Sequence, residues 1–458
     1  MCKRRSEVEI LNLNFSNVLG KIKVLNGMNN GPTKPSVRGM SNFESYKALE
    51  IPYARNHDAS FCTSYGGEHT VDVHRIFKNF DADENNPENY VFAPTDEYVR
   101  NTFEAGTKVF YRLGASIEHG YKYGTYPPKD FIKWARICEH IIRHYTEGWA
   151  DGFEYDIEYW EIWNEPDCHN TDGSNPCWQG TAKQFIDFFE VVAKHLKSVF
   201  PHLKIGGPAF CHSRFHEENA NDFKLAFLRA VKQREIPLDF YSFHGYLKNA
   251  ESVFELSEAA MKSLEIAGLK KPELIYNEWN YVREWVGPAY VYSRDMARGI
   301  KGAAFNTAVM CATQASDIDM LMYYDARPSN WCGLFESYSL KPLKPYYGYY
   351  LFKEIAKLGG WVKTDSRIGN VWAIAASDGT DGALMLAHYN DSDDIPPENV
   401  TVNVSRNSGK VGTRVEYYLL DGQNNGELLR EEIFTSDSFV LHLNMKLFDT
   451  YLIKFISI

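Results

Sequence analysis

Short apolar runs rich in β-branched and aromatic residues alternate with helical periodicity from about residue 21 to residue 357. Eight of these runs predict strands: Lys21–Gly27, Ile51–His57, Lys108–Gly114, Tyr159–Glu165, Lys204–Phe210, Asp239–Tyr246, Glu273–Asn280 and Asp319–Ala326. Helical patterns lie between them, and three clear ones begin at Asp130, Thr181 and Ala289, the last running to Thr313. This alternation predicts a parallel sheet whose strands are joined by helices.

Eight strands that alternate with helices over about 340 residues fit a (β/α)8 barrel with long βα loops. A doubly wound open sheet would show the same alternation, but no G-x-G-x-x-G or Walker A sequence follows the first strand. The expected fold class is therefore α/β, with a TIM barrel over residues 21–357.

Beyond residue 360 the helical periodicity disappears, and short alternating runs separated by DG, NN and PP take its place. This pattern is typical of an antiparallel β-sandwich, expected here over residues 358–458. The N-terminal EVEILNLNF also alternates, so residues 1–20 are expected to add a strand to the sandwich. The sequence has no internal repeat or low-complexity linker, which predicts that the two domains pack rigidly together.

Two of the predicted barrel strands carry a glutamate flanked by asparagine and aromatic residues. The fourth ends in WNEP around Glu165, and the seventh contains NEW around Glu278. The two glutamates are 113 residues apart (278 − 165), or about 38 residues for each of three βα units. Because the catalytic groups of TIM barrels lie at the C-terminal ends of the strands, we expect the two side chains to face each other across the mouth.

Paired carboxyl groups in this position indicate cleavage of a glycosidic bond. One carboxylic acid protonates the leaving oxygen, and one carboxylate attacks or stabilises the oxocarbenium-like centre. Retention of configuration requires the two groups to be roughly 5 to 5.5 Å apart. We expect an apolar, like-charged setting to raise the pKa of Glu165, the acid/base, and hydrogen-bond donors to keep Glu278 ionised as the nucleophile.

Six stretches of the chain closely resemble glycoside hydrolase family 39. They are YWEIWNEPD (159–167), LIYNEWN (274–280), VDVHRIFKNFDADENNPENYVFAPTDEYV (71–99), YRLGASIEH (111–119), FYSFHGY (240–246) and LMYYDARPSNWCGLF (321–335). The resemblance runs through most of residues 21–357. The family contains β-xylosidases, α-L-iduronidases and enzymes acting on other polysaccharides, so the resemblance implies the reaction better than the sugar. It also implies a β-sandwich beside the barrel.

The resemblance implies roles for three residues: Glu165 as acid/base, Glu278 as nucleophile, and Asn164 as the donor to the substrate 2-hydroxyl, a contact that tightens in the transition state. The SIEH ending of the third strand differs from the xylosidases and weakens an assignment to them.

Other polar and aromatic residues at the ends of the predicted strands, or in the loop after the eighth in the case of Trp331, are further candidates for contact with the sugar: Arg55, His57, Glu118, His119, His244, Tyr246 and Trp331. Arg55 and His57 fit either a contact to the nucleophile or sugar, or an interior ion pair. His244 and Tyr246 fit either orientation of Glu278 or simple loop hydrogen bonds. Trp331 fits a sugar platform or a packing residue. Glu161 lies one layer deeper and is interpreted as a structural carboxylate paired with an arginine.

Composition narrows the range of partners. The net charge of −11 and the pI near 5.7 argue against nucleic acid, and no apolar run approaches the roughly 18 residues that span a bilayer. Aromatic residues make up 15% of the chain, including 10 Trp and 29 Tyr, which suits the apolar faces of sugar rings but also large cores. We therefore expect an oligosaccharide or polysaccharide substrate, no nucleic acid and no membrane. The oligomeric state is left open.

The eight cysteines show no zinc-ribbon or redox CxxC spacing, and only Cys168 and Cys177 lie close together, as a disulfide or as two thiols. No metal is expected, because Asp81–Phe92 lacks the Gly and Glu of a calcium loop and Asp391–Asp394 resembles a solvated acidic turn. MCKRRSEVEI is not followed by an apolar stretch, so no signal peptide is expected. A cytoplasmic protein and a trimmed secreted one both fit.

The sequence thus predicts a retaining glycoside hydrolase, exo-acting and without cofactor, that works through a covalent glycosyl-enzyme intermediate. Two alternatives stay open. One is a non-catalytic polysaccharide-binding barrel, although the presence of both glutamates argues against it. The other is an endo-acting hydrolase on the same fold.

Overall fold

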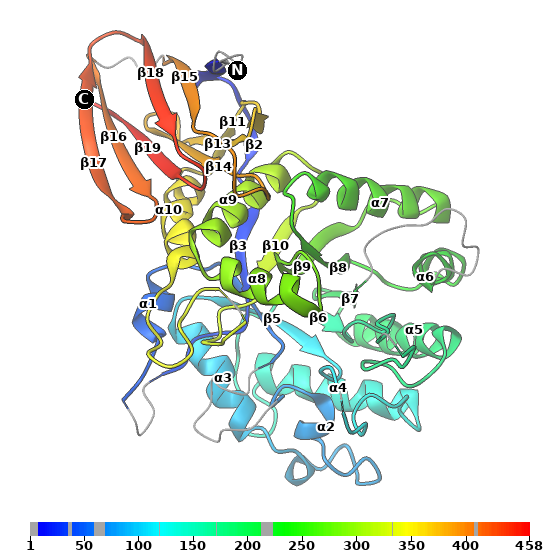
Figure 1. Cartoon of the computed structure of the whole chain (residues 1–458). Coiled ribbons are helices and arrows are strands. Elements are labelled where there is room, and N and C mark those ends of the chain that lie inside the picture. Colours follow the sequence, from blue (N-terminus) through cyan, green and yellow to red (C-terminus); the bar gives the residue numbers. More distant parts are fainter. Residues whose placement is uncertain are drawn as a thin grey trace.

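The computed structural model describes residues 8–34, 39–58, 69–118, 120–170, 172–211, 223–331, 333–406 and 411–458. Eight parallel strands close into a barrel in the order β10-β3-β4-β5-β6-β7-β8-β9 (Figure 1). They are β3 (Val24–Asn29), β4 (Tyr53–Asn56), β5 (Lys108–Leu113), β6 (Tyr159–Ile162), β7 (Lys204–Phe210), β8 (Phe240–Leu247), β9 (Glu273–Tyr281) and β10 (Met320–Tyr323). The predicted TIM barrel is confirmed.

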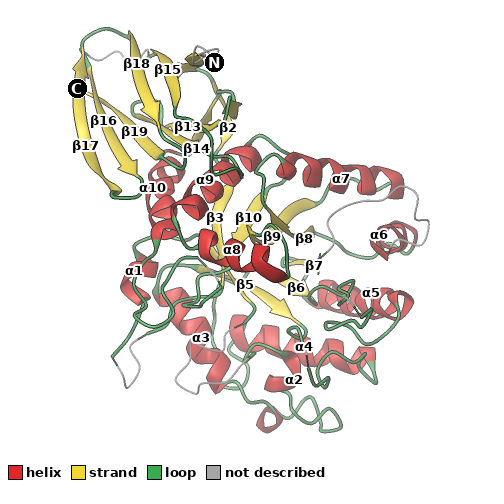
Figure 2. Cartoon of the chain, in the orientation of Figure 1, coloured by secondary structure: helices red, strands yellow, loops and turns green. Residues whose placement is uncertain are grey.

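Helices surround the barrel (Figure 2). They are α1 (Phe43–Lys47), α2 (Val73–Ile76), α3 (Ala93–Glu104), α4 (Phe131–Thr146), α5 (Ala182–Val199), α6 (Phe223–Gln233), α7 (Ser252–Ala267), α8 (Gly287–Ala297), α9 (Ile300–Gln314) and α10 (Lys344–Leu358), with a 3₁₀ turn at Pro87–Asn89. The predicted starts of α4 and α5 agree with their caps: the Asp130 carboxylate accepts two backbone N–H groups, and Thr181 forms a capping box with Gln184.

The single helix predicted from Ala289 to Thr313 is wrong. The structure has two helices, α8 and α9, that are separated at Arg298 and Gly299. Gly299 caps α9 in an extended conformation with ψ −167°, which a continuing helix does not allow. Every residue of α9 from Lys301 to Gln314 is buried, whereas only Ser293 and Ala297 of α8 are, so the break also separates a buried helix from a partly exposed one.

The C-terminal region forms two sheets packed face to face, as expected for a β-sandwich. The smaller sheet has the order β1-β15-β18, and the larger has the order β17-β16-β19-β14-β13-β11-β2, with β12 paired to β13. The strands are β1 (Val8–Asn14), β2 (Val18–Lys21), β11 (Gly360–Val362), β12 (Arg367–Ile368), β13 (Val371–Ser377), β14 (Gly382–His388), β15 (Glu398–Ser405), β16 (Thr413–Leu420), β17 (Asn425–Phe434), β18 (Ser438–Met445) and β19 (Thr450–Ser457). Alternate apolar residues of both sheets, such as Val402 and Val415, form the core between them.

Two features of the sandwich depart from the sequence pattern. Strand β17 was not predicted, because NGELLREEIF has polar side chains on both faces and lies at the edge of the larger sheet with most of its residues exposed. The N-terminal stretch supplies two strands. β1 pairs in parallel with β15, and β2 pairs with β11. The sandwich therefore contains both the first and the last described strands of the chain (Figure 1).

The barrel and the sandwich share one apolar core. All residues of β13 and β14 are buried, because one face of these strands packs against the smaller sheet and the other packs against α9 and α10. Trp372, Ile374 and Met385 on this second face belong to the same cluster as the barrel core. Figure 1 shows α9 and α10 between the barrel and the larger sheet.

A polar clamp beside this core joins the two domains at the end of β9. Its sandwich side is Asp391, whose carboxylate accepts hydrogen bonds from Tyr281 at 2.6 Å and from Arg283 Nε at 2.9 Å. The side chain of Lys301 on α9 is only 1% exposed, and its Nζ lies 2.9 Å from Asp393 Oδ1. The acidic turn is exposed at residues 392–394, as the sequence indicated, and its Asp391 and Asp393 also form interdomain ion pairs.

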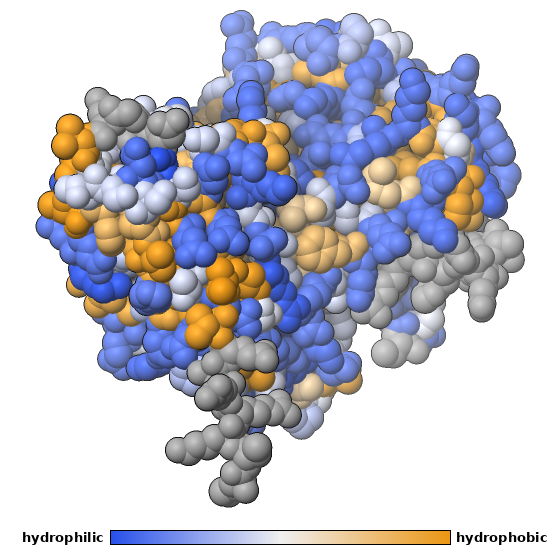
Figure 3. Space-filling model, turned by 90° about the horizontal axis from the view of Figure 1, so that it is seen from above, coloured by the Kyte–Doolittle hydropathy of each residue, from blue (hydrophilic) through white to orange (hydrophobic). Residues whose placement is uncertain are grey.

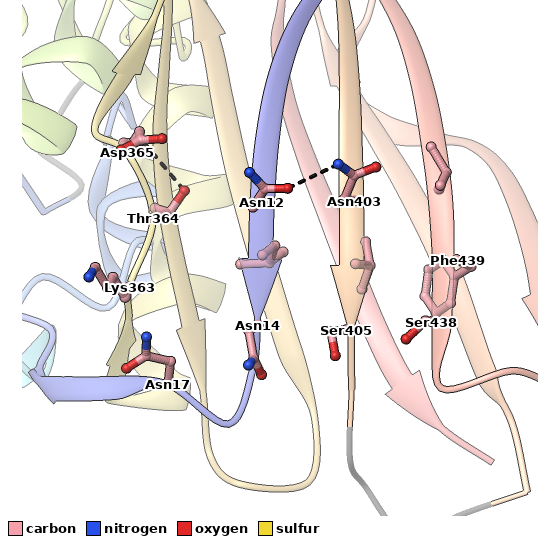
Figure 4. A pocket seen from close by; sticks show the side chains of 13 residues that line it. Asn12, Asn14, Asn17, Lys363, Thr364, Asp365, Asn403, Ser405, Ser438 and Phe439 are labelled. Carbon is pink, nitrogen blue, oxygen red and sulfur yellow. Dashed lines mark hydrogen bonds between the residues drawn. The ribbon is translucent and has the colours of Figure 1, made fainter.

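A hollow of about 620 Å³ lies on the sandwich, between the smaller sheet and the segment 363–365 (Figure 4). Its polar lining consists mainly of amides and hydroxyls, including Asn12 and Asn403, whose side chains are hydrogen-bonded to each other at 2.9 Å. The charged residues that line it are Lys363 and Asp365. The hollow therefore lacks the paired carboxyl groups predicted for the barrel mouth.

The outer surface shown in Figure 3 is mostly hydrophilic, and its apolar residues form small separate patches. Within the described residues, none of the helices has the length and apolar character needed to cross a membrane.

Removing the carboxylate of the clamp should weaken the packing of the two domains. We expect Asp391→Ala to cost about 2 kcal/mol, because the change leaves charged and hydroxyl donors without their acceptor. The midpoint of urea unfolding, followed by tryptophan fluorescence, measures the effect. Asp394→Ala, at an exposed position of the same turn, is the matched control. Equal midpoints for the two variants would contradict a structural role of Asp391.

Candidate active site

Glu165 lies three residues beyond the end of β6, on a sharply turning backbone. Trp163 and Glu165 both have positive φ, at 76° and 47°, which costs of order 1–3 kcal/mol at each non-glycine residue. Neighbouring strands hold this conformation, because Trp163 N–H donates to Leu113 at 2.6 Å and Glu165 N–H donates to Ala209 at 3.0 Å. The turn buries the Trp163 indole and directs the Glu165 carboxyl to the C-terminal mouth of the barrel.

Glu278 lies within β9 at a β-bulge. The pairing of β8 with β9 shifts by one residue there, so that Phe243 pairs with Tyr276 while His244 pairs with Glu278. A bulge breaks the alternation of side chains, and two consecutive residues can then face the same side. Asn277 and Glu278 both reach the barrel interior, where Asn277 Nδ2 donates to Glu161 at 2.6 Å. The bulge therefore lets one strand supply both a structural amide and the candidate nucleophile.

The barrel brings the two predicted carboxyl groups together. One carboxylate oxygen of Glu165, one of Glu278 and a ring nitrogen of His244 all lie within 4.8 Å of one another. His244 Nδ1 is 2.7 Å from Glu165 and 3.6 Å from Glu278. Both glutamates are nearly buried, with exposed fractions of 9% and 7%. This spacing fits the roughly 5 to 5.5 Å between carboxyl groups that double displacement requires.

Arg55 on β4 lies beneath the pair and contacts four side chains. The guanidinium is fully buried and donates hydrogen bonds to the carboxylates of Glu161, at 2.7 Å, and Glu278, at 3.2 Å. It also donates to the side-chain amide oxygens of Asn29 and Asn164. The pairing of Glu161 with an arginine agrees with the role interpreted from the sequence. Arg55 thus has both roles considered for it, as an interior ion pair and as a contact to the candidate nucleophile.

Two further contacts orient the groups that would meet a sugar. Arg55 can only donate hydrogen bonds, so the atom of Asn164 that lies 2.6 Å from it is the amide oxygen. The amide NH₂ of Asn164 is then directed away from Arg55 as a donor. On the other side, the Tyr246 hydroxyl donates to Glu278 Oε1 at 2.5 Å. Tyr246 therefore orients Glu278, while the shorter contact of His244 is to Glu165.

Burial dominates the electrostatics of the site. It raises the pKa of Glu165 well above the usual range, with Asp167 nearby adding to the effect, and it raises the pKa of Glu278 to about 7. It also lowers the pKa of His244 to about 4, so that this imidazole is neutral. The expected donors to Glu278, Arg55 and Tyr246, are present. They only partly offset burial, because Glu161 shares the charge of Arg55.

The remaining predicted residues have other partners. His57 accepts a hydrogen bond from Arg112 Nε at 3.2 Å and lies 3.6 Å from Asp58, so its contacts are interior ones. The Glu118 carboxylate accepts the backbone N–H groups of residues 123–125 and the Thr125 hydroxyl, which makes it an anchor of its own loop. His119 lies outside the described residues.

Trp331 belongs to an aromatic rim above Glu278. Its ring centroid is 5.6 Å from that of Tyr246, 5.9 Å from Trp285 and 5.2 Å from Tyr324. Trp285 is 54% exposed. The rings are tilted against one another, and exposed aromatic rings at the mouth of a pocket suit the apolar face of a sugar. Trp285 was missed by the sequence analysis because no strand-end position marks it.

Among the described residues, two groups of side chains have their potential metal-ligating atoms within 4.8 Å of one another. One is the Glu165, His244 and Glu278 group itself, and the other joins Glu165 to Cys168 and Cys177. The first group contains the candidate acid/base and nucleophile. The second is a separate thiol-rich group on one side of Glu165.

The model of glycosyl hydrolases family 39 matches residues 59–280, a range that contains both glutamates. This match supports the resemblance to family 39 that the sequence indicated. Two relatives are named β-xylosidases: one from Geobacillus stearothermophilus is 35% identical over 127 residues, and one from Caldicellulosiruptor saccharolyticus is 26% identical over 214 residues. These matches cover 27% and 42% of the chain, but only 22% and 41% of the two relatives.

The crystal structure of a glucosidase from Croceicoccus marinus resembles this chain over its whole length. The TM-score is 0.81, and the match covers 99% of the chain and 100% of the glucosidase. At 20% sequence identity, this similarity shows that the barrel and sandwich occur in the same arrangement in both proteins.

The hydrogen bond from the Tyr246 hydroxyl should lower the pKa of Glu278 in the candidate active site. This hydrogen bond stabilises the carboxylate, so Tyr246→Phe should raise the pKa of Glu278 above its value of about 7. The acidic limb of kcat/KM against pH then moves to higher pH, because activity appears only as Glu278 ionises.

Tyr290→Phe removes a hydroxyl from the neighbouring rim and is the matched control for this change. An acidic limb that stays in place in Tyr246→Phe, or moves to lower pH, would refute the assignment of that limb to Glu278.

Proposed function

We propose that this protein is a retaining glycoside hydrolase that acts by double displacement. The observation that carries the proposal is the approach of Glu165 and Glu278 to within 4.8 Å at the mouth of the barrel. An inverting enzyme needs room for a water between its carboxyl groups and separates them by about 6.5–9.5 Å. The match to family 39 and the difference in environment between the two carboxyls support the same reaction.

In the first step, the Glu278 carboxylate attacks the anomeric carbon while the Glu165 carboxylic acid gives its proton to the glycosidic oxygen. The C–O bond to the leaving group breaks, and a glycosyl ester forms on Glu278. In the second step, Glu165 takes a proton from water, and the water oxygen displaces Glu278 from the anomeric carbon. The sugar is released with its original configuration. The cycle restores both carboxyl groups and consumes one water.

The environment of each glutamate supports its role. Glu165 lies next to Asp167, and burial disfavours its charge, so it keeps a proton near neutral pH. Glu278 contacts Arg55 and Tyr246, which favour the carboxylate. Asn164, turned so that its NH₂ points away from Arg55, would donate to the sugar 2-hydroxyl.

We further propose that the enzyme is exo-acting and releases a terminal sugar. Both carboxyl groups lie deep beneath the aromatic rim of Tyr246, Trp285 and Trp331, as a pocket for a chain end would require. The names of the relatives, two β-xylosidases and a glucosidase, support this direction and leave the sugar to be determined. An endo-acting enzyme would instead release internal fragments from a polysaccharide early in the reaction.

A panel of aryl glycosides and plant or microbial oligosaccharides tests the reaction. We expect the wild-type protein to hydrolyse at least one β- or α-linked sugar, and the product seen first by NMR to keep the configuration of the substrate. Glu278→Ala should have no activity on that substrate. Binding across the panel without hydrolysis would favour the alternative, a polysaccharide-binding barrel, and an inverted product would refute double displacement.

Leaving-group dependence tests the role of Glu165. In Glu165→Gln, substrates with poor leaving groups should slow by about 10²–10⁴-fold, the usual contribution of general acid catalysis. Activated aryl glycosides should slow much less in their first step, because their leaving groups need no proton. The comparison is kcat/KM for two aryl glycosides of the same sugar whose phenols differ in pKa. Equal losses on both would contradict the assigned role.

A further inference from the structure

Three thiols gather beside Glu165, on the side away from Arg55. Cys168 and Cys177 come from the loop between β6 and α5, and Cys211 follows β7, the next strand of the barrel. The sulfurs of Cys168 and Cys177 and a carboxylate oxygen of Glu165 lie within 4.8 Å of one another. Cys211 adjoins Cys168, and its backbone N–H is hydrogen-bonded to Asp167 at 2.9 Å. None of the three is part of a disulfide, so the sequence alternative of two unbridged cysteines describes this structure.

The charges around this group have one sign. The charged side chains that act most strongly on Cys177 and Cys211 are Glu165 and Asp167, both carboxylates. The thiols thus lie beside two carboxyl groups, and a cation that displaces the proton of Glu165 would balance the charge that these groups acquire. Cys168 and Cys211 are partly exposed, which gives an ion a route to the group from the barrel mouth.

The geometry suits a thiophilic ion. Zinc-type ions bind thiolate sulfur at about 2.3 Å and carboxylate oxygen at about 2.0–2.2 Å, so two bound sulfurs lie at most about 4.6 Å apart. One ligand atom from each of Cys168, Cys177 and Glu165 lies within 4.8 Å of the other two, so small side-chain rotations would bring all three onto one ion. Two sulfurs and one oxygen form a ligand set that prefers Zn²⁺ or Cd²⁺ to Mg²⁺ or Ca²⁺.

We propose that Cys168, Cys177 and Glu165 form a binding site for a thiophilic divalent cation, with Cys211 next to it as a further sulfur. Binding exchanges the protons of the two thiols and of the Glu165 carboxyl for the metal and releases all three to solvent. Because Glu165 is a ligand, the bound ion takes the lone pair that would otherwise hold the catalytic proton. The site is thus inhibitory, and this second part rests on the proposed function of Glu165.

Cadmium alone is a suitable probe, because cadmium–thiolate bonds absorb in the ultraviolet. We expect Cd²⁺ added to the reduced protein to produce this absorption with saturation. Cys168→Ser should remove the part due to this site and weaken binding by more than about tenfold, as loss of a ligand or its support does. Cys311→Ala, which changes a buried thiol of α9, is the matched control and should keep the wild-type signal.

Glu165→Gln tests the oxygen ligand separately. It should weaken cadmium binding while the thiolate absorption at saturation remains, a result that a fold defect would not produce. The proposal is overturned if wild-type and Cys168→Ser titrations coincide, or if Glu165→Gln binds cadmium as tightly as the wild type does.

Inhibition is measured on an aryl glycoside that the wild-type protein hydrolyses. Cadmium should abolish turnover by the wild type and by Cys311→Ala at the concentrations that saturate the absorption, and should leave Cys168→Ser active. Equal inhibition of Cys168→Ser would refute inhibition through this site. Absence of hydrolysis in metal-free protein would refute the proposed function instead, and the absorption titration would still decide whether the ion binds.

Discussion

The geometry of the barrel mouth depends on the buried guanidinium of Arg55. A buried cation is tolerated only when its charge and its N–H groups are satisfied. Here the partners come from three barrel strands and from the turn after β6: Asn29, Glu161, Glu278 and Asn164. Since one rigid, planar group contacts all of them, no strand end can shift without leaving a donor unsatisfied. This constraint holds the candidate nucleophile and the 2-hydroxyl donor in a fixed relation.

The contacts of Arg55 also affect the pKa values of the two candidate catalytic glutamates. Glu161 lies closer to Arg55 than Glu278 does, so the positive charge of Arg55 stabilises the Glu161 carboxylate more than the Glu278 carboxylate. Glu278 therefore keeps only part of the cation's influence, and its pKa rises with burial. Glu165 lies beyond the reach of a direct contact with Arg55, next to Asp167, and its pKa rises further. Burial raises the pKa of both side chains, and the rise is offset more at Glu278, which Arg55 and Tyr246 contact directly, than at Glu165, where Asp167 adds to it.

The repeating parts of the fold could be predicted from the sequence because their signals are local. Strand ends, caps such as Asp130 and Thr181, and the glutamate at the end of a strand all show within a few residues. The features that were missed depend on contacts between distant segments. Asn29 was hidden because the first barrel strand runs to it rather than to Gly27, and the bulge before Glu278 appears only in the pairing with β8. The partners of His57 and Glu118 are likewise set by tertiary contacts that no pattern reveals.

Helix α9 has a consequence for the chain as a whole. An outer helix of a typical barrel presents one polar face to water, but residues Lys301–Gln314 are covered on every side, with the barrel below and strands β13 and β14 above. The sandwich therefore shields α9 of the barrel from solvent, and the barrel depends on it for the burial of this helix. A barrel cut free at residue 358 would expose a broad apolar strip and would be prone to self-association, so the two domains constitute a single unit of folding and inheritance.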